Sequence, residues 1–398
     1  MIRMLSMLLC LSLFFMLLAG CWSRRELDEL GISVGIGIDK AGKGYKVTTQ
    51  VVSPGEIAAA KPSGNRAPVT VYEATGETVI EAIRKITTMS SRPIYLAHLR
   101  VLVIGEALAR EGIHKPLDHF SRDHEVRTDY FVIVAKGTTA SNVLKILTPI
   151  EKIPANNLYL SLDTSQKEWA PAATVTLDEL ISDIVSDGKN PALSAVKVVD
   201  KQIGQTQKNI EIIKPPGHLR FSGIAVFRDD KLIGFLNEKE SKGYNYVTDN
   251  VKNTVGSMAC PNGEKIAVEI MKSKTKVKAK MSNGNPRIEI KVSMEDNIGE
   301  VECQIDITKR ETIAELEKIA ERRVHDNIMN TVKKVQRDLK VDIFGFGEAM
   351  RMENPAAWNQ LKQNWNERFS DLDVFVTADV KIRRIGTVAN SFHKEGEE

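Results

Sequence analysis

The sequence has few cysteines and little net charge, and both shortages exclude classes of protein. Its 398 residues include four cysteines, 55 basic and 52 acidic side chains, with a formal net charge of +3. A charge so close to neutral gives no electrostatic case for nucleic-acid binding, which needs a clustered basic face. No two cysteines form a CxxC pair, so neither a zinc ribbon nor a thioredoxin-type redox site is supported.

Catalytic and metal-binding motifs are also missing. The sequence has no HExxH, GxSxG or Walker A motif in the required context. His114, His119 and His124 recur every five residues, which would place their side chains on different faces of a helix. The other histidines are far apart in the sequence. We therefore predict no catalytic residue, no metal site and no cofactor.

A long apolar run occurs only at the N-terminus. After Arg3, residues 4–18 are apolar except for two serines. This run suits a secretory leader better than a spanning helix, which needs about 20 residues. Residues 18–21 (LAGC) complete a bacterial lipobox. We predict a signal peptide over 1–20, lipid on the Cys21 thiol, and an extracytoplasmic chain beyond it. An uncleaved anchor or a cut elsewhere are the alternatives.

Two cysteines, Cys260 and Cys303, remain for the folded part of the chain. Cys10 lies in the predicted leader, and Cys21 is assigned to the lipid. In an oxidising exterior the remaining two could form one disulfide. We favour the other interpretation, in which both pack unpaired as small apolar side chains.

Strand and helix patterns alternate through the first half of the chain. Alternating β-branched residues predict a hairpin over 31–52, and apolar residues at helical spacing predict a helix over 77–89. From this alternation we predict an N-terminal α/β domain over 21–200. A middle domain or linker over 201–262 follows, with a β-hairpin at 219–236.

The pattern changes in the C-terminal part. Alternating residues predict three strands, at 265–270, 275–280 and 287–292. Residues 312–339 carry apolar side chains at helical spacing, which predicts a long amphipathic helix. We predict a C-terminal α+β domain over 263–390. The expected fold class is therefore mixed α+β, with three domains whose mixed sheets are flanked by helices.

Three further features have both a functional and a structural interpretation. Trp358 and Trp365 could line an aromatic ligand pocket, but we interpret them as core residues. The charge cluster at 122–127 could be a buried ion network or a partner-binding edge, although mixed charge is more typical of a solvated helix end. We interpret the glycine-rich run at 344–348 as the C-terminal turn of the long helix.

Short blocks in a fixed order resemble the Ger(x)C family, the C subunits of spore germinant receptors in endospore-forming bacteria. The resemblance covers nearly the whole chain after the leader. Among its blocks are Gly20-Cys21-Trp22, Gly35-Ile36-Gly37-Ile38-Asp39, Gly223-Ile224-Ala225-Val226-Phe227 and Asp342-Ile343-Phe344-Gly345-Phe346-Gly347-Glu348, followed by Trp358 and Trp365.

The resemblance implies three mixed α/β domains and no known enzymatic activity. It implies assembly with two integral membrane proteins, the A and B subunits, in a nutrient-sensing complex of the spore inner membrane. It aligns Cys21 with the family's lipidated cysteine, which implies a lipid anchor in the outer leaflet. Neither the nutrient nor any contact between it and this subunit follows from the sequence.

Two other functions stay open beside the receptor subunit. A solute-binding lipoprotein of a membrane transporter would consist of two lobes of repeated βαβ units. A lipoprotein hydrolase acting on the spore wall would need a nucleophile or paired acids in a cleft. We expect the receptor subunit.

Overall fold

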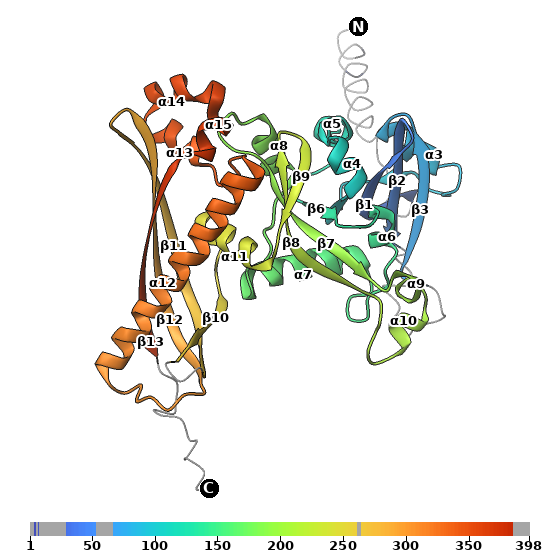
Figure 1. Ribbon diagram of the computed structural model, residues 1–398. Helices are drawn as coiled ribbons and strands as arrows, with labels where there is room; N and C mark the ends of the chain where they lie inside the picture. Colours follow the sequence, from blue (N-terminus) through green and yellow to red (C-terminus); the bar gives the residue numbers. More distant parts are fainter. Residues whose placement is uncertain (1–3, 5–6, 8–28, 53–66, 261–263, 385–398) are drawn as a thin grey trace.

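The computed structural model describes residues 4, 7, 29–52, 67–260 and 264–384. Figure 1 shows two sheets, a large one built from the first part of the chain and a long, narrow one built from the last part. The mixed α+β fold and the long C-terminal helix are both confirmed. The predicted lipobox, including Cys21, lies outside the described residues.

The large sheet has nine strands, with parallel strands in the middle and antiparallel hairpins at both edges. β5 and β6 are buried at every residue, as is typical of central parallel strands covered on both faces. In spatial order the strands are β3 (Val69–Gly76), β2 (Gly44–Val52), β1 (Gly31–Ala41), β5 (Val101–Gly105), β6 (Phe131–Ala135), β7 (Ala192–Val199), β8 (His218–Arg228) and β9 (Lys231–Leu236), while the short β4 (Ile94–Tyr95) pairs with β1.

Helices cover both faces of this sheet, and alternate residues of β5 therefore enter two separate cores. Leu102 and Ile104 belong to one core, and Val101 and Val103 belong to the other. The first core includes residues of α3 (Val79–Ile86), α4 (Glu106–Glu111), α5 (His114–Arg122) and α8 (Leu177–Val185), and the second includes residues of α6 (Ala140–Leu144) and α7 (Pro154–Glu168). The short helices α9 (Lys201–Gly204) and α10 (Lys208–Glu211) precede β8.

The second sheet has four strands, three of them long, and helices on one side. Its order is β10 (Thr254–Ala259), β11 (Lys265–Ser282), β12 (Asn285–Val301) and β13 (Asp373–Arg384), and only the last pair is parallel. Its helices are α11 (Glu238–Val247), α12 (Arg310–Lys334), α13 (Phe346–Glu353), α14 (Pro355–Leu361) and α15 (Trp365–Ser370). A π-helical turn, Val335–Leu339, extends α12, which lies across the sheet in Figure 1.

Two of the predicted C-terminal strands are one continuous strand, β11. A register shift between Ile270 and Lys272 interrupts its alternation of buried and exposed side chains. Because a bulge moves later side chains to the opposite face, it looks like a strand break in the sequence. Asn283 and Gly284 take left-handed conformations in the turn between β11 and β12.

The hairpin at 219–236 is formed by β8 and β9, which extend the large sheet from β7. The described residues are therefore divided between two sheets, with α11 following the hairpin as the chain passes to the second sheet.

Cys260 and Cys303 form a disulfide, so the prediction that both stay unpaired is wrong. Cys260 follows the end of β10, and Cys303 follows the end of β12. Both of these strands pair with the first residues of β11, one on each side of it. The sheet thus brings the two cysteines to Cα atoms 6.4 Å apart, a proximity that depends on strand pairing and not on sequence spacing.

Candidate functional site

Residues singled out in the sequence do not assemble a catalytic or metal centre among the described residues. Three histidines, His98, His119 and His124, line one cavity of about 770 Å³. Burial lowers the pKa of His119, which favours the neutral ring. No described group of three or more His, Cys, Asp or Glu side chains is arranged to hold a metal ion. Nor does any described helix combine the length and apolar character needed to cross a bilayer.

The charge cluster at 122–127 lies at an exposed helix end. Arg122, 77% exposed, pairs with Asp118 one turn earlier on α5 at 2.8 Å. Arg127 pairs with Asp129 in a similarly exposed position. Exposed pairs of this kind contribute about 0–1 kcal/mol each. The interpretation as a solvated helix end therefore fits the structure better than a buried ion network.

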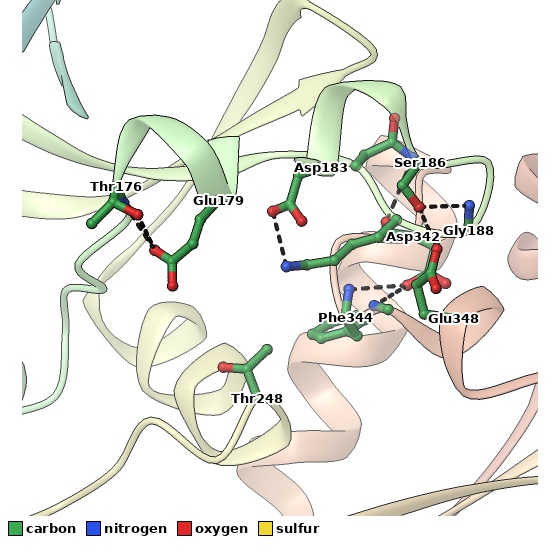
Figure 2. Close-up of polar contacts among 12 residues, drawn as sticks. Thr176, Glu179, Asp183, Ser186, Gly188, Thr248, Asp342, Phe344 and Glu348 are labelled. Carbon is green, nitrogen blue, oxygen red and sulfur yellow. Dashed lines mark hydrogen bonds and ion pairs between the residues drawn. The ribbon is translucent and has the colours of Figure 1, made fainter. Parts of the chain in front are cut away.

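Each sheet together with the helices that cover it is called a sheet unit. The most extensive polar network lies at the junction between the two units, which we define as the loop 186–190 and the segment 341–348. Figure 2 shows Ser186 and Gly188 of the first loop opposite Asp342 and Glu348 of the second. The first loop leads from α8 into β7, and the second leads from the long helix into α13. The junction thus joins an element of each sheet unit.

Asp342 organises the second loop. Its side chain is fully buried and accepts hydrogen bonds from the backbone N–H groups of Phe344, Gly345 and Gly347, at 2.8–2.9 Å. The indole Nε1 of Trp365 donates a fourth bond at 2.9 Å. Burial raises the pKa of Asp342, and the four donors oppose that effect by stabilising the carboxylate. The result is a rigid turn with its buried oxygen atoms satisfied.

Backbone and side-chain bonds tie the first loop to the second. The Asn190 N–H donates to the carbonyl of Asp342 at 2.6 Å. The Asn190 side chain donates to Asn366 at 3.3 Å and accepts from the backbone of Asp229 at 2.9 Å. The Ser186 hydroxyl donates to Glu348 at 2.6 Å. These contacts connect α8, the β8–β9 turn and the C-terminal helices.

Two glycines let the loops touch backbone to backbone. A Cβ atom added at Gly188 would lie 2.8 Å from the backbone of Gly347, and one added at Gly347 would lie 2.6 Å from the Cα of Gly188. Real Cβ atoms do not approach so closely, so a larger residue at either position would push the loops apart. Close backbone approach is a characteristic reason for glycine in a loop.

A half-buried ion pair lies beside this contact. The ammonium of Lys189 is 2.9 Å from the carboxylate of Asp183 on α8. Burial acts to lower the pKa of Lys189, but the neighbouring Tyr244 and Asp183 raise it above its usual value. The lysine therefore stays charged inside the junction.

An aromatic core supports the junction from the C-terminal side. Trp358 and Trp365 are 4% and 2% exposed, and their rings meet edge to face at 5.2 Å. Their interpretation as core residues is confirmed. The interpretation of residues 344–348 is corrected, because Lys340 supplies the left-handed residue that ends the long helix, while Phe346 begins α13.

Among the described residues of the junction, no nucleophile is paired with a base. The contacts that they make are structural. These contacts satisfy buried polar groups across two sheets and so fix the relative position of the sheets. Sequence reasoning missed Asp342 and Gly188. An aspartate just before an aromatic-glycine run was a usable signal for the first, but nothing in the sequence pointed to the partner loop.

The fold and this junction define a two-sheet α+β protein whose described parts are joined by hydrogen bonds and a backbone contact. The family described as "Spore germination protein N-terminal domain" matches residues 23–198. The family described as "Spore germination B3/ GerAC like, C-terminal" matches residues 222–386. Together these matches span most of the chain, and the chain belongs to this spore germination family.

Individual relatives agree with the family match over nearly their full length. The chain is 31% identical to "Spore germination protein KC" of Bacillus subtilis (strain 168), with 96% of each chain covered. It is 26% identical to "Spore germination protein B3" of the same organism, over 94% of this chain and 97% of that one. A crystal structure of the GerBC protein has a similar fold, with a TM-score of 0.55 and 24% identity, over 87% of this chain and 96% of that one.

Proposed function

We propose that this protein is a non-enzymatic, lipid-anchored subunit of a nutrient germinant receptor in the spore inner membrane. The observation that supports this most strongly is the 31% identity with "Spore germination protein KC" across 96% of both chains. The second support is the lipobox, residues 18–21, at the end of an apolar leader.

The lipid on Cys21 would hold the large sheet close to the outer leaflet. Gly31, where β1 begins, lies ten positions after Cys21. Even a fully extended chain of that length spans no more than about 35 Å. The part of the protein next to the membrane is therefore the large sheet with its helices.

The junction would make both sheet units act on the partner subunits as one body. The bonds from Asn190 to Asp342 and from Ser186 to Glu348, together with the contact of Gly188 with Gly347, cross from one unit to the other. A rigid body held at the surface can brace the two integral membrane subunits, A and B, and transmit a displacement between them. The nutrient itself is not assigned to any residue by this proposal.

The predicted alternative, a solute-binding lipoprotein of a transporter, fits the architecture poorly. That class consists of two lobes of repeated βαβ units. Here the two sheets have nine and four strands, with different strand orders and a helical cover on one side of the second. We do not retain this alternative.

The anchor is tested in spores that carry Cys21→Ala. We expect this variant to leave the inner-membrane fraction, and we expect acyl chains on the N-terminal peptide of the wild type only. Cys10→Ala, a cysteine change within the leader, is the matched control and should leave both properties unchanged. Full membrane retention of Cys21→Ala with an unmodified N-terminal peptide in the wild type would contradict the proposal.

The complex is tested by purifying the tagged wild-type chain from spore membranes. We expect two multi-spanning proteins to copurify with it in fixed proportion. Purification of the chain alone, under conditions that leave other membrane complexes intact, would argue against a receptor subunit.

A further inference from the structure

A groove of about 890 Å³ lies within the second sheet unit, between the sheet and its helices. β10, β11 and β12 form the floor, and α11 and α12 form the walls; Figure 1 shows both helices lying against this sheet. Much of the lining is apolar, with Met258, Val268 and Met294 from the strands and Ala320 and Val324 from α12.

One carboxylate, that of Asp296, interrupts this apolar floor. Asp296 is 1% exposed, and neither of its carboxylate oxygens has a hydrogen-bond partner. Its neighbours in register on the adjacent strands are Ile270 and Ile382. Along β12 the next inward-facing residues are Met294 and Ile298, both buried. No described neighbour therefore supplies a donor.

Two other buried carboxylates of this chain, unlike Asp296, accept hydrogen bonds. Asp342 accepts four hydrogen bonds, as described above. Asp39, 5% exposed, accepts from the backbone N–H groups of Ala140 and Ser141 at 2.8 and 2.9 Å. A buried carboxylate without a hydrogen-bond partner destabilises the folded state, and this applies to Asp296. Asp296 is one of the residues that line the groove, so the groove is the side from which a donor would approach it.

Charged side chains also lie at the rim of the groove, but they contribute less to ligand selection than Asp296 on the floor. The ammonium of Lys242 lies 3.2 Å from the ring centroid of Trp169, and the indole Nε1 of that residue donates to Glu238 at 2.7 Å. Arg323 is exposed on α12. Lys242 is half-buried, and burial lowers its pKa to about 8, which weakens its positive charge; the charge of the exposed Arg323 is screened by solvent. Asp296 therefore decides what the groove selects.

We propose that this groove binds a small organic molecule with an ammonium group and an apolar body. The ammonium pairs with Asp296, and the apolar body packs against Met258 and Met294. An ammonium supplies three donors, which suits a carboxylate with two unpaired oxygens. This inference does not depend on the receptor proposal.

The test compares phenethylamine with its neutral counterpart, 2-phenylethanol, on the full-length protein in detergent. Saturation-transfer NMR gives both dissociation constants. We expect phenethylamine to bind at least about tenfold more tightly than the alcohol, a difference of about 1.4 kcal/mol. Asp296→Asn keeps the shape of the side chain and removes its charge, and it should abolish the preference.

A matched control is Asp379→Asn, which removes an exposed carboxylate on the neighbouring strand β13 and should leave the preference intact. Circular dichroism confirms that each variant is folded. The proposal is overturned if the wild type binds the two compounds equally or neither of them up to about 10 mM, or if Asp296→Asn retains the preference for the amine.

Discussion

Replacing Asp296 by Asn should stabilise the protein at pH 8, although it changes a fully buried residue. Burial raises the pKa of Asp296 from 3.8 to about 7. Each pKa unit corresponds to about 1.4 kcal/mol, so the ionised side chain costs the folded state about 4 kcal/mol above pH 7. The Asn amide stays without partners and costs about 2 kcal/mol. We therefore expect a net gain of about 2 kcal/mol.

The sign of the pH dependence follows from the same shift. Between about pH 4 and pH 7 the folded state holds a proton on Asp296 that the unfolded chain releases. The free energy of unfolding of the wild type, relative to the variant, thus falls as the pH rises through this window. Tyr246, Lys242 and Arg323 also face the groove, but they are present in both proteins and cancel in the difference.

Thermal unfolding at pH 4.5 and pH 8, without any amine present, measures this effect. We expect Asp296→Asn to unfold about 5 °C above the wild type at pH 8 and to lose that advantage at pH 4.5. A variant less stable than the wild type at pH 8, or a difference that is the same at both pH values, would refute the reasoning. Either result would mean that Asp296 has a partner in solution.

Three further changes test the junction, the disulfide and the large sheet. Gly188→Ala would place a Cβ 2.8 Å from the facing backbone, and we expect it to lower the free energy of unfolding in urea by about 1–3 kcal/mol. The control is Gly299→Ala, whose Cβ would be 3.7 Å from its nearest neighbour and which should lower that free energy much less. Cys303→Ser opens a crosslink over a sequence separation of 43 and should cost about 4 kcal/mol, and reductant should erase the difference from wild type. Burial alone would raise the pKa of Glu73, but hydrogen bonds from Ser141 and two lysines lower it to about 2. Glu73→Gln should therefore cost about 1–2 kcal/mol at pH 7, a difference that disappears as the pH falls from 4.5 towards 2; equal loss at every pH would contradict the assignment.

Local patterns were enough to predict most of the strands and the long helix. The turn at Asn283 and Gly284 was predictable because a two-residue hairpin loop needs left-handed conformations, which these residue types tolerate. The long helix was predictable because its apolar stripe, from Leu316 to Val332, packs on one face of a sheet. Both features depend on residues close together in the sequence.

Features that depend on pairing between distant segments could not be predicted in the same way. The disulfide of Cys260 and Cys303 follows from two strands that flank β11. The junction joins Gly188 to Gly347 across two sheets. Asp296 lies beyond the end of the strand predicted at 287–292, although the alternation of buried residues continues through Met294 to Ile298.

Spore germination in the absence of this chain tests the central claim most directly. The optical density of spores is followed after addition of amino acids, sugars or nucleosides, with the gene deleted and then restored. Loss of the response to one nutrient class, with germination by other routes intact and recovery on restoration, is the predicted result. An unchanged response to every nutrient, in spores that also lack related receptor genes, would contradict the account.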